Sequence, residues 1–304
     1  MRDAGVPTAK SFTCESRVEI EKALDAFGAP YVVKDDGLAA GKGVVVTENR
    51  EVALQHALSC KRVVIEEYLK GPEISLFGIS DGKNILPMQP AQDFKRAYDN
   101  DEGPNTGGMG AYSPLPWAPT DIVEDTYRQV LAPMIAEMAA RGTPFVGLLY
   151  AGLAVTDRGI RVIEFNARFG DPETQVLIPR LKTPLAQLLF KAATGNLIDA
   201  SLDWHNDSAV TVVLAANGYP SEVKTGDEIT NLKPVEDAVI FHAGTKEDGK
   251  LIASGGRVLT VTGIGSDLTQ ARDKAYRTIS QIKLAGSFYR NDIALNASVA
   301  EKGN

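Results

Sequence analysis

Two lysines stand on either side of a glycine-rich stretch near the start of the sequence. Lys34 closes a β-prone run, and Lys42 lies between Gly41 and Gly43. Glycine lets backbone N–H groups approach phosphate oxygens, and lysine supplies positive charge. The stretch is not a Walker A loop, because the spacing from Gly37 to Gly41 is one residue short and Gly43 stands where Ser or Thr should bind magnesium. A phosphate-binding hairpin and a plain β-hairpin with surface lysines both fit this pattern.

A strand that runs into acidic residues is the second candidate. Residues 63–65 are apolar and β-branched, and Glu66, Glu67 and the sequence YLKGPE at 68–73 follow them. Hinge backbone of this kind can bind an adenine edge through one carbonyl and one N–H, and a carboxylate can bind ribose hydroxyls. A solvated acidic loop explains the same residues, so this pattern alone does not decide.

The third candidate is the run IEFNARFGDPE at residues 163–173. Glu164 and Asn166 share one face of a strand, because the side-chain period of a strand is two. Their oxygens are hard ligands suited to Mg²⁺ bound with nucleotide phosphates. Arg168 follows and could neutralise a developing oxyanion or bind a phosphoryl group. The alternative is an edge strand that ends in a salt-bridged polar turn.

Composition excludes several classes of function. The chain has 304 residues and a net charge of −7, which argues against binding to nucleic acid or to anionic membranes. Two cysteines are too few for a disulfide framework and fit a reducing cytosol. The three histidines show no metal-binding or triad spacing. No apolar run reaches the ~18 residues of a membrane helix, and no leader peptide is visible. We therefore expect a cytoplasmic protein.

Periodicity predicts the elements that position these residues. Ser16 and Glu19 form a capping box before a helix that ends at Gly28. Further strands and helices are predicted along the first half of the chain, at residues 30–34, 44–47, 51–58 (helix), 63–65, 73–80 and 84–88. Residues 89–119 are rich in Gly, Pro, Asn and Asp and have little periodicity, so we expect a long loop that is either functional or disordered.

A long helix should follow Thr120 as its N-cap, kink at Pro133 and end at Gly142. Strands at 145–156 and 160–165 look like neighbours joined by the turn at 157–159. Pro184 should occupy the first position of another helix, which Gly195 closes. The polar stretch 200–208 predicts a domain boundary, and the remainder carries strands and one amphipathic helix, at residues 209–216, 239–243, 257–262 and 267–282 (helix).

The order of these motifs resembles the ATP-grasp superfamily and, within it, the phosphoribosylamine–glycine ligase family. The stretches that carry the resemblance include GPNTGGMGAY at 103–112 and RFGDPE at 168–173, and RFGDPE is very specific to this family. The similarity covers almost the whole chain, and is also carried by residues 34–46, 92–114, 150–153, 162–175, 218–220, 241–245, 255–258 and 288–293.

The resemblance implies an α+β chain with an ATP-grasp domain at 1–205, followed by a small C-terminal domain at 206–304. The ATP-grasp domain would comprise a lid part at about 1–73 and a larger part at about 74–205. It further implies a two-step reaction of purine biosynthesis. Glycine is first activated by ATP to glycyl phosphate, and 5-phosphoribosylamine then displaces phosphate to give glycinamide ribonucleotide. The implied cofactors are ATP and Mg²⁺, or Mn²⁺.

The family's site residues carry over as expectations. ATP binding falls to Lys34, Gly41, Lys42 and Gly43 at the phosphates, to Glu66, Glu67 and Leu69 at the adenine hinge, and to Glu73 at the ribose. Metal binding falls to Glu164 and Asn166, and the acyl-phosphate oxyanion to Arg168. Asp171 and Glu173 would orient the amine, and Lys95 and Arg96 would face an anionic substrate.

Two features depart from the family pattern. Asp35 stands where the family has a small residue, typically alanine. The sequence opens in what looks like the interior of the family, so we expect its N-terminal Rossmann-like domain to be missing. Two alternative functions therefore stay open: another ATP-grasp carboxylate–amine ligase, or an ATP-binding chain with little ligase activity of its own. The sequence leaves the oligomeric state open.

Overall fold

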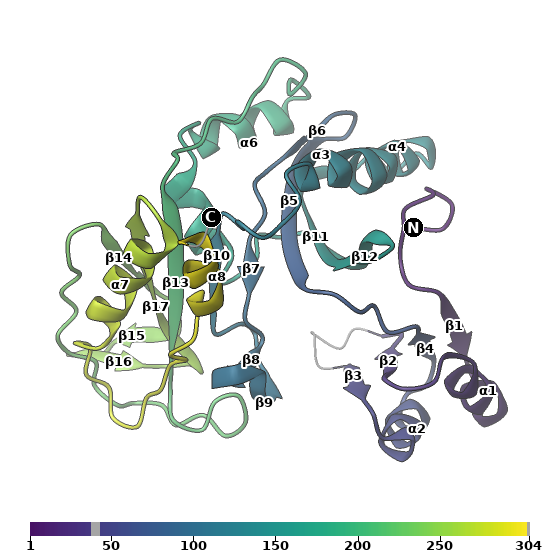
Figure 1. The fold of residues 1–304 in the computed structure, drawn as a ribbon, viewed down its shortest axis with the longest axis horizontal. Helices are drawn as coiled ribbons and strands as arrows, with labels where there is room; N and C mark the ends of the chain where they lie inside the picture. The colour runs from purple at the N-terminus through teal and green to yellow at the C-terminus, as the bar shows by residue number, and fades with distance from the viewer. Residues whose placement is uncertain (38–42, 303–304) are drawn as a thin grey trace. The chain divides into compact units, whose positions relative to one another are not determined.

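The computed structural model describes residues 1–37 and 43–302. The chain divides into two compact units. The first comprises Met1–Pro72 with Ala154–Ile163, and the second comprises Glu73–Leu153 with Glu164–Asn304. Figure 1 shows the path of the chain and the element labels. Among the described residues, no helix has the length and apolar character needed to cross a membrane.

The first unit is a four-stranded antiparallel sheet covered by two helices. The strand order is β1-β4-β2-β3, with β1 (Ser11–Cys14), β2 (Tyr31–Asp35), β3 (Val44–Thr47) and β4 (Val63–Glu66). Helices α1 (Arg17–Phe27) and α2 (Arg50–Ser59) supply the rest of the core. Alternate strand residues, among them Val33, Val63 and Ile65, point into this core beside Leu24 and Leu54.

The predicted capping box of α1 is confirmed. The Ser16 hydroxyl accepts from the Glu19 N–H at 3.4 Å, and a Glu19 carboxylate oxygen accepts from the Ser16 N–H at 3.0 Å. Gly28 ends the helix at a φ of 72°, a value that glycine adopts readily. Capping interactions between residues close in the sequence therefore define both ends of α1.

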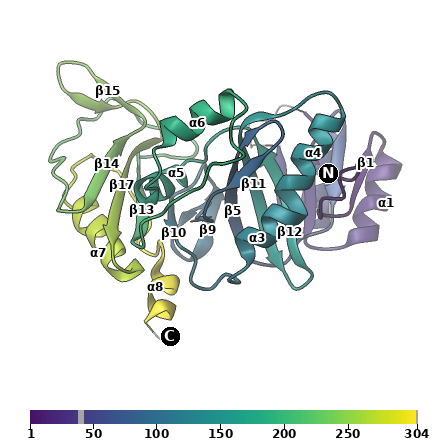
Figure 2. The same cartoon turned by 90° about the horizontal axis from the view of Figure 1, so that it is seen from above.

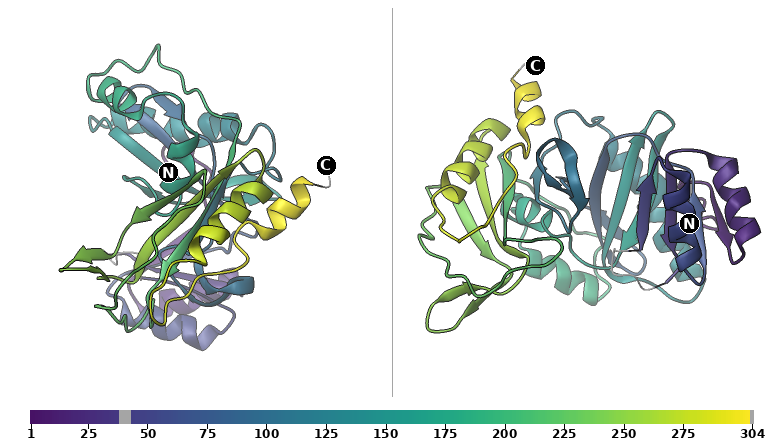
Figure 3. Two further views of the ribbon diagram at one scale, coloured as in Figure 1. Left: turned by 90° about the vertical axis from the view of Figure 1, so that its left-hand side faces the viewer. Right: turned by 90° about the horizontal axis from the view of Figure 1, so that it is seen from below.

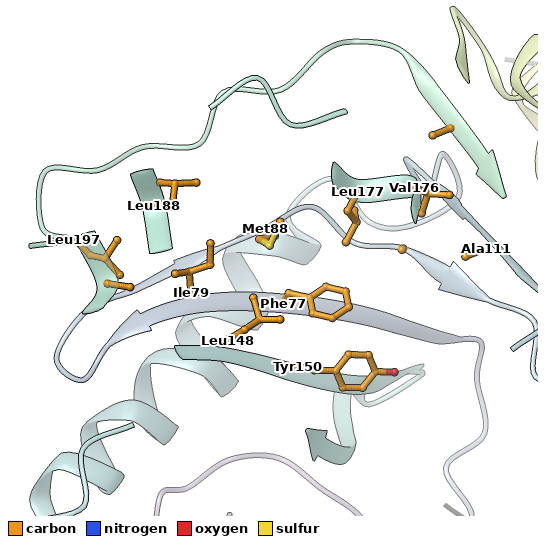
Figure 4. Packing of buried hydrophobic residues seen from close by; sticks show 13 residues of the cluster. Phe77, Ile79, Met88, Ala111, Leu148, Tyr150, Val176, Leu177, Leu188 and Leu197 are labelled. Carbon is orange, nitrogen blue, oxygen red and sulfur yellow. The ribbon is translucent and has the colours of Figure 1, made fainter. Parts of the chain in front are cut away.

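Another four-stranded sheet has the order β12-β11-β5-β6. Its strands are β5 (Glu73–Asp81), β6 (Ile85–Pro87), β11 (Val146–Thr156) and β12 (Gly159–Asn166), so the predicted neighbours at 145–156 and 160–165 are confirmed. Phe77 and Ile79 on one face of β5 belong to a cluster with Leu188 of α6 (Leu185–Ala193), drawn in Figure 4. Gly78 points the other way, and a Cβ there would lie 3.2 Å from Leu131. Both faces of β5 are therefore covered.

The helix on that other face differs from the prediction. It comprises α3 (Ile122–Thr126), a π-helical turn η2 (Tyr127–Leu131) and α4 (Ala132–Ala140). Asp121 rather than Thr120 precedes it. Pro133 lacks an N–H and lies in the first turn of α4, directly after this π-helical turn. Similarly, Pro184 lies just before α6 rather than inside it.

The expectation of little regular structure at 89–119 is wrong for half of that segment. It contains β7 (Gln92–Asp93), β8 (Arg96–Tyr98), the 3-10 turn η1 (Asp99–Asp101), β9 (Glu102–Asn105) and β10 (Gly110–Ser113). Strands of two to four residues are too short to show a period, so their partners define them. β8 pairs with β9, and β10 pairs with β13, about a hundred residues further along the chain.

A five-stranded sheet of order β14-β17-β13-β10-β7 completes the second unit. Its later strands are β13 (Ser208–Ala215), β14 (Ala238–His242) and β17 (Arg257–Gly265), and β15 (Thr245–Glu247) pairs with β16 (Leu251–Ala253) in a separate hairpin. Every residue of β13 is buried, as expected for a strand covered on both faces.

Helix α7 (Leu268–Ile279) packs against β13 and β17, and α5 (Thr174–Leu177) packs against β13 and β10. The short elements η3 (Ile178–Arg180) and α8 (Leu295–Glu301) complete the set. Figures 2 and 3 show these elements from other sides.

The antiparallel pairings and segregated helices confirm the α+β class. The pairing of β10 with β13 joins strands from both sides of residue 205. The boundaries at about 73 and at 205 stay predictions.

Candidate functional site

The end of β12 presents Glu164 and Asn166 side by side. Asn166 Nδ2 donates to Glu164 Oε1 at 3.0 Å, so the two side chains share a face, as a two-residue period requires. Glu164 is exposed. One carboxylate and one amide oxygen suit a hard divalent cation. Among the described residues no three His, Cys, Asp or Glu side chains form a metal-binding group. A pair of donors of this kind fits a cation whose other ligands come from phosphates and water.

The turn after β12 carries Arg168 and Asp171, which are both exposed. Arg168 Nη1 donates to the Phe169 carbonyl at 3.0 Å. Asp171 accepts from Gln175 Nε2 at 2.9 Å and forms an ion pair with Arg257 at 3.2 Å. The guanidinium of Arg168 is thus free of any carboxylate among the bonds described, whereas Asp171 is fixed from two sides.

Glu173 turns inward instead. It is 4% exposed, and its Oε1 accepts from the Ser75 hydroxyl at 2.9 Å. Ser75 Oγ also lies 2.9 Å from the Tyr150 hydroxyl. Burial raises the pKa of Tyr150, and the negative charges of Glu173 and Asp93 raise it further. Tyr150 therefore stays a neutral hydrogen-bonding group beside the carboxylate.

Lys95 lies among several acids. Its ammonium forms an ion pair with Glu73, at the start of β5. Desolvation raises the pKa of Asp93 to about 6, and Glu173 and Glu73 add to this against the opposing charge of Lys95. Desolvation lowers the pKa of Lys95, but Asp93, Glu73 and Tyr150 outweigh it and the pKa rises. We refer to Glu73, Asp93, Lys95, Tyr150 and Glu173 as the Lys95 cluster.

The predicted residues Arg96 and Leu69 take no part in the bonds of this cluster. Arg96 is exposed in β8, with Nη1 3.4 Å from the Asn105 side-chain oxygen. Leu69 is half-buried in the segment after β4. Their predicted roles stay predictions.

In the first unit, Lys34 of β2 is held by two partners. Its Nζ lies 2.6 Å from Glu66 and donates to the Ile163 carbonyl at 3.1 Å. The Gly43 carbonyl accepts from the Asp35 N–H at 2.8 Å and lies 3.1 Å from His56 Nε2. Gly41 and Lys42 lie outside the described residues.

Glu67 follows Glu66, the partner of Lys34, and is itself fixed by a hydrogen bond and an ion pair. Its Oε1 accepts from the Lys10 N–H at 3.0 Å and lies 3.3 Å from the guanidinium of Arg158. Desolvation raises the pKa of Glu67, but the Lys10 N–H and Arg158 outweigh it and the pKa is lowered. Glu67 therefore stays ionised, and its own N–H donates to the Lys10 carbonyl at 2.9 Å.

Sequence reasoning missed the side chains that brace these groups, namely Ser75, Tyr150, Arg158 and Arg257. Arg257 lies 86 residues from Asp171 along the chain, and no local pattern reports such a pair. Arg257 belonged only to a short stretch that resembles the family, GGRV at 255–258.

Comparison with known families decides which fold carries these groups. The family model of the phosphoribosylglycinamide synthetase ATP-grasp (A) domain matches residues 1–174. The model of the C domain of the same synthetase matches residues 209–296. The chain belongs to the phosphoribosylglycinamide synthetase family. It is thus a member of a family of ATP-dependent carbon–nitrogen ligases, as its motifs predicted.

Individual relatives agree with this membership. The phosphoribosylamine–glycine ligase of Streptomyces coelicolor is 61% identical over 307 residues, a match that covers 99% of this chain and 74% of that relative. The ligase of Caulobacter vibrioides is 46% identical, covering 96% of this chain and 72% of that relative.

Solved structures agree on the fold. The crystal structure of phosphoribosylamine–glycine ligase from Thermotoga maritima superposes with a TM-score of 0.88 at 34% identity, covering 97% of this chain and 76% of that one. A biotin carboxylase from Campylobacter jejuni has a TM-score of 0.75 at only 15% identity, covering 99% of this chain and 71% of that one, and so shares the fold alone. The predicted ATP-grasp fold is confirmed.

Proposed function

We propose that this chain joins glycine to 5-phosphoribosylamine at the expense of ATP, giving glycinamide ribonucleotide, ADP and phosphate. One observation carries the proposal. Two domains of one synthetase family match in order, and the strand end within the first of them presents Glu164 and Asn166 ahead of Arg168. The substrates are small molecules, and the cytoplasmic location stays a prediction.

The reaction has two steps. A carboxylate oxygen of glycine attacks the γ-phosphorus of ATP, and ADP leaves. The amine nitrogen of phosphoribosylamine then attacks the carbonyl carbon of glycyl phosphate, phosphate leaves, and the nitrogen loses a proton. Positioning and charge neutralisation supply most of the catalysis in such transfers, because little covalent chemistry falls to side chains.

The metal-binding role falls to Glu164 and Asn166. Mg²⁺ or Mn²⁺ held there would neutralise charge on the nucleotide phosphates. The hydrogen bond from Asn166 Nδ2 to Glu164 supports this role, since it leaves the Asn166 carbonyl oxygen free to act as a ligand.

Nucleotide binding falls to residues of the first unit and to Glu73. Lys34, Gly41, Lys42 and Gly43 contact the phosphates, Glu66, Glu67 and Leu69 form the adenine hinge, and Glu73 binds the ribose. The tight placement of Lys34 supports its part, because an ammonium already fixed by Glu66 and a carbonyl loses little freedom on binding phosphate.

The substrates fall to residues of the second unit. Arg168 stabilises the oxyanion of the acyl phosphate, since its guanidinium has no carboxylate partner among the bonds described. Asp171 and Glu173 orient the amine and accept its proton, while Lys95 and Arg96 face the phosphate of phosphoribosylamine. Several acids around a single lysine favour a nearby ammonium, which supports an amine site at the Lys95 cluster.

Hydroxylamine trapping tests the first step. The purified chain is mixed with Mg-ATP, glycine and hydroxylamine, which attacks the acyl phosphate carbonyl and releases phosphate. We expect glycine hydroxamate and ADP in equal amounts, and neither product without glycine. Hydroxamate formed from another carboxylate but not from glycine would indicate a different ATP-grasp ligase. Nucleotide binding without any ADP would indicate an ATP-binding chain without the ligase step.

A further inference from the structure

Gly107, in the turn between β9 and β10, is held at both of its backbone polar groups by the last third of the chain. Its N–H donates to the Tyr219 hydroxyl at 2.9 Å, and its carbonyl accepts from Arg257 Nη1 at 2.6 Å. These partners lie 112 and 150 residues away along the sequence. Exposed turns usually satisfy such groups with water or local bonds, so this turn is held in an unusually specific way.

Arg257 also holds a second segment. Nη1 donates to the Asp171 carbonyl at 2.7 Å, and Nη2 forms an ion pair with the Asp171 carboxylate at 3.2 Å. Nη1 thus bridges the carbonyls of Gly107 and Asp171, and it makes a longer bond of 3.5 Å to the Gly108 carbonyl. A planar guanidinium with fixed donor directions sets the separation of two such acceptors, which a lysine ammonium does not. The Arg257 side chain is 22% exposed, so water competes little for these bonds.

The two segments also pack too closely for larger residues. A Cβ at Gly107 would lie 2.9 Å from Arg257 Cζ. A Cβ at Gly108, where φ is 113°, would overlap the ring of Pro172. The turn and the segment after β12 therefore meet at a distance that glycine permits and other residues do not.

The β9–β10 turn that Arg257 and Tyr219 hold is also hydrogen-bonded to Lys95. The Thr106 N–H and hydroxyl both donate to the Lys95 carbonyl, at 2.7 and 2.8 Å. Lys95 and Asp171 are two residues that the proposed function places against the substrates. A chain of direct contacts thus runs from Lys95 through Thr106, Gly107 and Arg257 to Asp171.

We infer that Arg257 and Tyr219 are positioning residues for the ligation step. They fix the spacing between the backbone of Lys95 and the carboxylate of Asp171, so that the segment after residue 208 serves the reaction as well as the fold. The inference rests on the proposed function. A brace that only stabilised the second unit would instead affect all of its segments alike.

Variants at both positions test this inference. Arg257→Ala removes the side-chain bonds of Arg257 to Gly107 and Asp171. Arg257→Lys keeps the positive charge but loses the planar guanidinium, and Tyr219→Phe removes the hydroxyl that accepts from the Gly107 N–H. Arg272→Lys is the matched control, because Arg272 also binds two carbonyls, those of Ile293 and Asn291, but touches neither clamped segment. Two readouts apply: steady-state kinetics, and hydrogen exchange of segments 104–110 and 168–173.

We expect kcat to fall about 100-fold in Arg257→Ala, about 10-fold in Arg257→Lys and about 3-fold in Tyr219→Phe, since small misplacements of reacting groups slow ligation steeply. The KM for ATP should stay within about twofold, because nucleotide contacts lie elsewhere. Exchange should rise in the two clamped segments, while β13 and β17 keep their protection. Arg272→Lys should leave kcat and both segments unchanged.

Wild-type kcat in Arg257→Ala, or exchange that rises equally across the second unit, would overturn the inference. An unmodified chain that forms no ligation product would count against the proposed function instead. In that case hydrogen exchange still tests whether Arg257 and Tyr219 hold the two segments in place. Unchanged protection of segments 104–110 and 168–173 in Arg257→Ala and Tyr219→Phe would overturn the inference.

Discussion

Each unit contains a lysine–glutamate pair, and the two pairs differ in their surroundings. Lys34 and Glu66 lie 2.6 Å apart on neighbouring strands, with side chains 20% and 17% exposed. Lys95 and Glu73 also form an ion pair, but their side chains are 43% and 49% exposed. Lys34 has one acid and one carbonyl as partners, whereas Lys95 interacts with Asp93 and Glu73 together.

Because the two lysine–glutamate pairs differ in exposure and in charge balance, they suit different ligands. The first pair is balanced and shielded from water, so it holds a cation in a fixed place, as the binding of phosphates requires. In the second region, desolvation raises the pKa of Asp93 to about 6, and Glu173 and Glu73 add to the rise. The excess of negative charge around one ammonium favours a cationic or amine ligand. This contrast supports the proposal that Lys34 and Glu66 serve the nucleotide and that the acids around Lys95 serve the amine.

The largest expected effect concerns Glu164, for which we propose a role in metal binding. Glu164→Gln keeps the shape and the hydrogen bond with Asn166 but removes the charge. Because loss of even an indirect metal partner costs 10–100-fold in affinity, we expect Mg-ATP to bind at least about 100-fold more weakly. Calorimetric titration of the folded variant measures this. Glu236→Gln, at an exposed glutamate, is the control, and unchanged affinity in Glu164→Gln would remove Glu164 from the site.

A smaller effect tests the two lysines directly. Lys34→Met leaves the shielded Glu66 without its partner, so we expect the free energy of unfolding to fall by about 2 kcal/mol. Lys95→Met disrupts an exposed pair and should cost under about 1 kcal/mol. Urea denaturation measures both, and the double variant Lys34→Met/Glu66→Gln should recover most of the first loss. Equal losses in the two single variants would contradict the contrast between the pairs.

The same two regions show what the sequence could and could not predict. The β2–β3 hairpin, the capping box of α1 and the Glu164–Asn166 pair follow from rules that act over a few residues, and all three are present. The family motifs identified the fold. Partners that come from distant sequence, such as Arg158 for Glu67, Tyr150 and Ser75 for Glu173, and Arg257 for Asp171, leave no local pattern.

The four short strands between Gln92 and Ser113 illustrate the same limit. A strand of two residues such as β7 has no periodicity of its own, and pairing with β10 defines it. Likewise, the inward turn of Glu173 depends on Ser75, which arrives on a strand about a hundred residues earlier. Tertiary contacts decide such features, and the sequence alone supplies only the residue types.

The last expected effect is the pH dependence of the Lys95 cluster. In the unfolded chain Asp93 has its ordinary pKa of 3.8, and folding raises it to about 6. The folded protein therefore binds this proton more tightly. The stability it contributes is present below pH 3.8 and is lost as the pH rises towards and through 6. Asp93→Asn should remove that fall in the free energy of unfolding, measured with urea between pH 4 and 7.

Asp199→Asn, at an exposed aspartate, is the control for this measurement and should retain the fall. An Asp93→Asn variant with the wild-type pH profile would show that Asp93 titrates normally and that the Lys95 cluster carries no excess of negative charge.

The most direct test of the central claim is the formation of glycinamide ribonucleotide from labelled glycine, Mg-ATP and freshly prepared 5-phosphoribosylamine. We predict that the purified chain forms one ADP for each labelled product and that omission of the amine abolishes the product. Glu164→Gln should abolish both ADP release and product formation. ADP release that is independent of glycine, or bound Mg-ATP with no labelled product, would contradict the assignment of this chain as a phosphoribosylamine–glycine ligase.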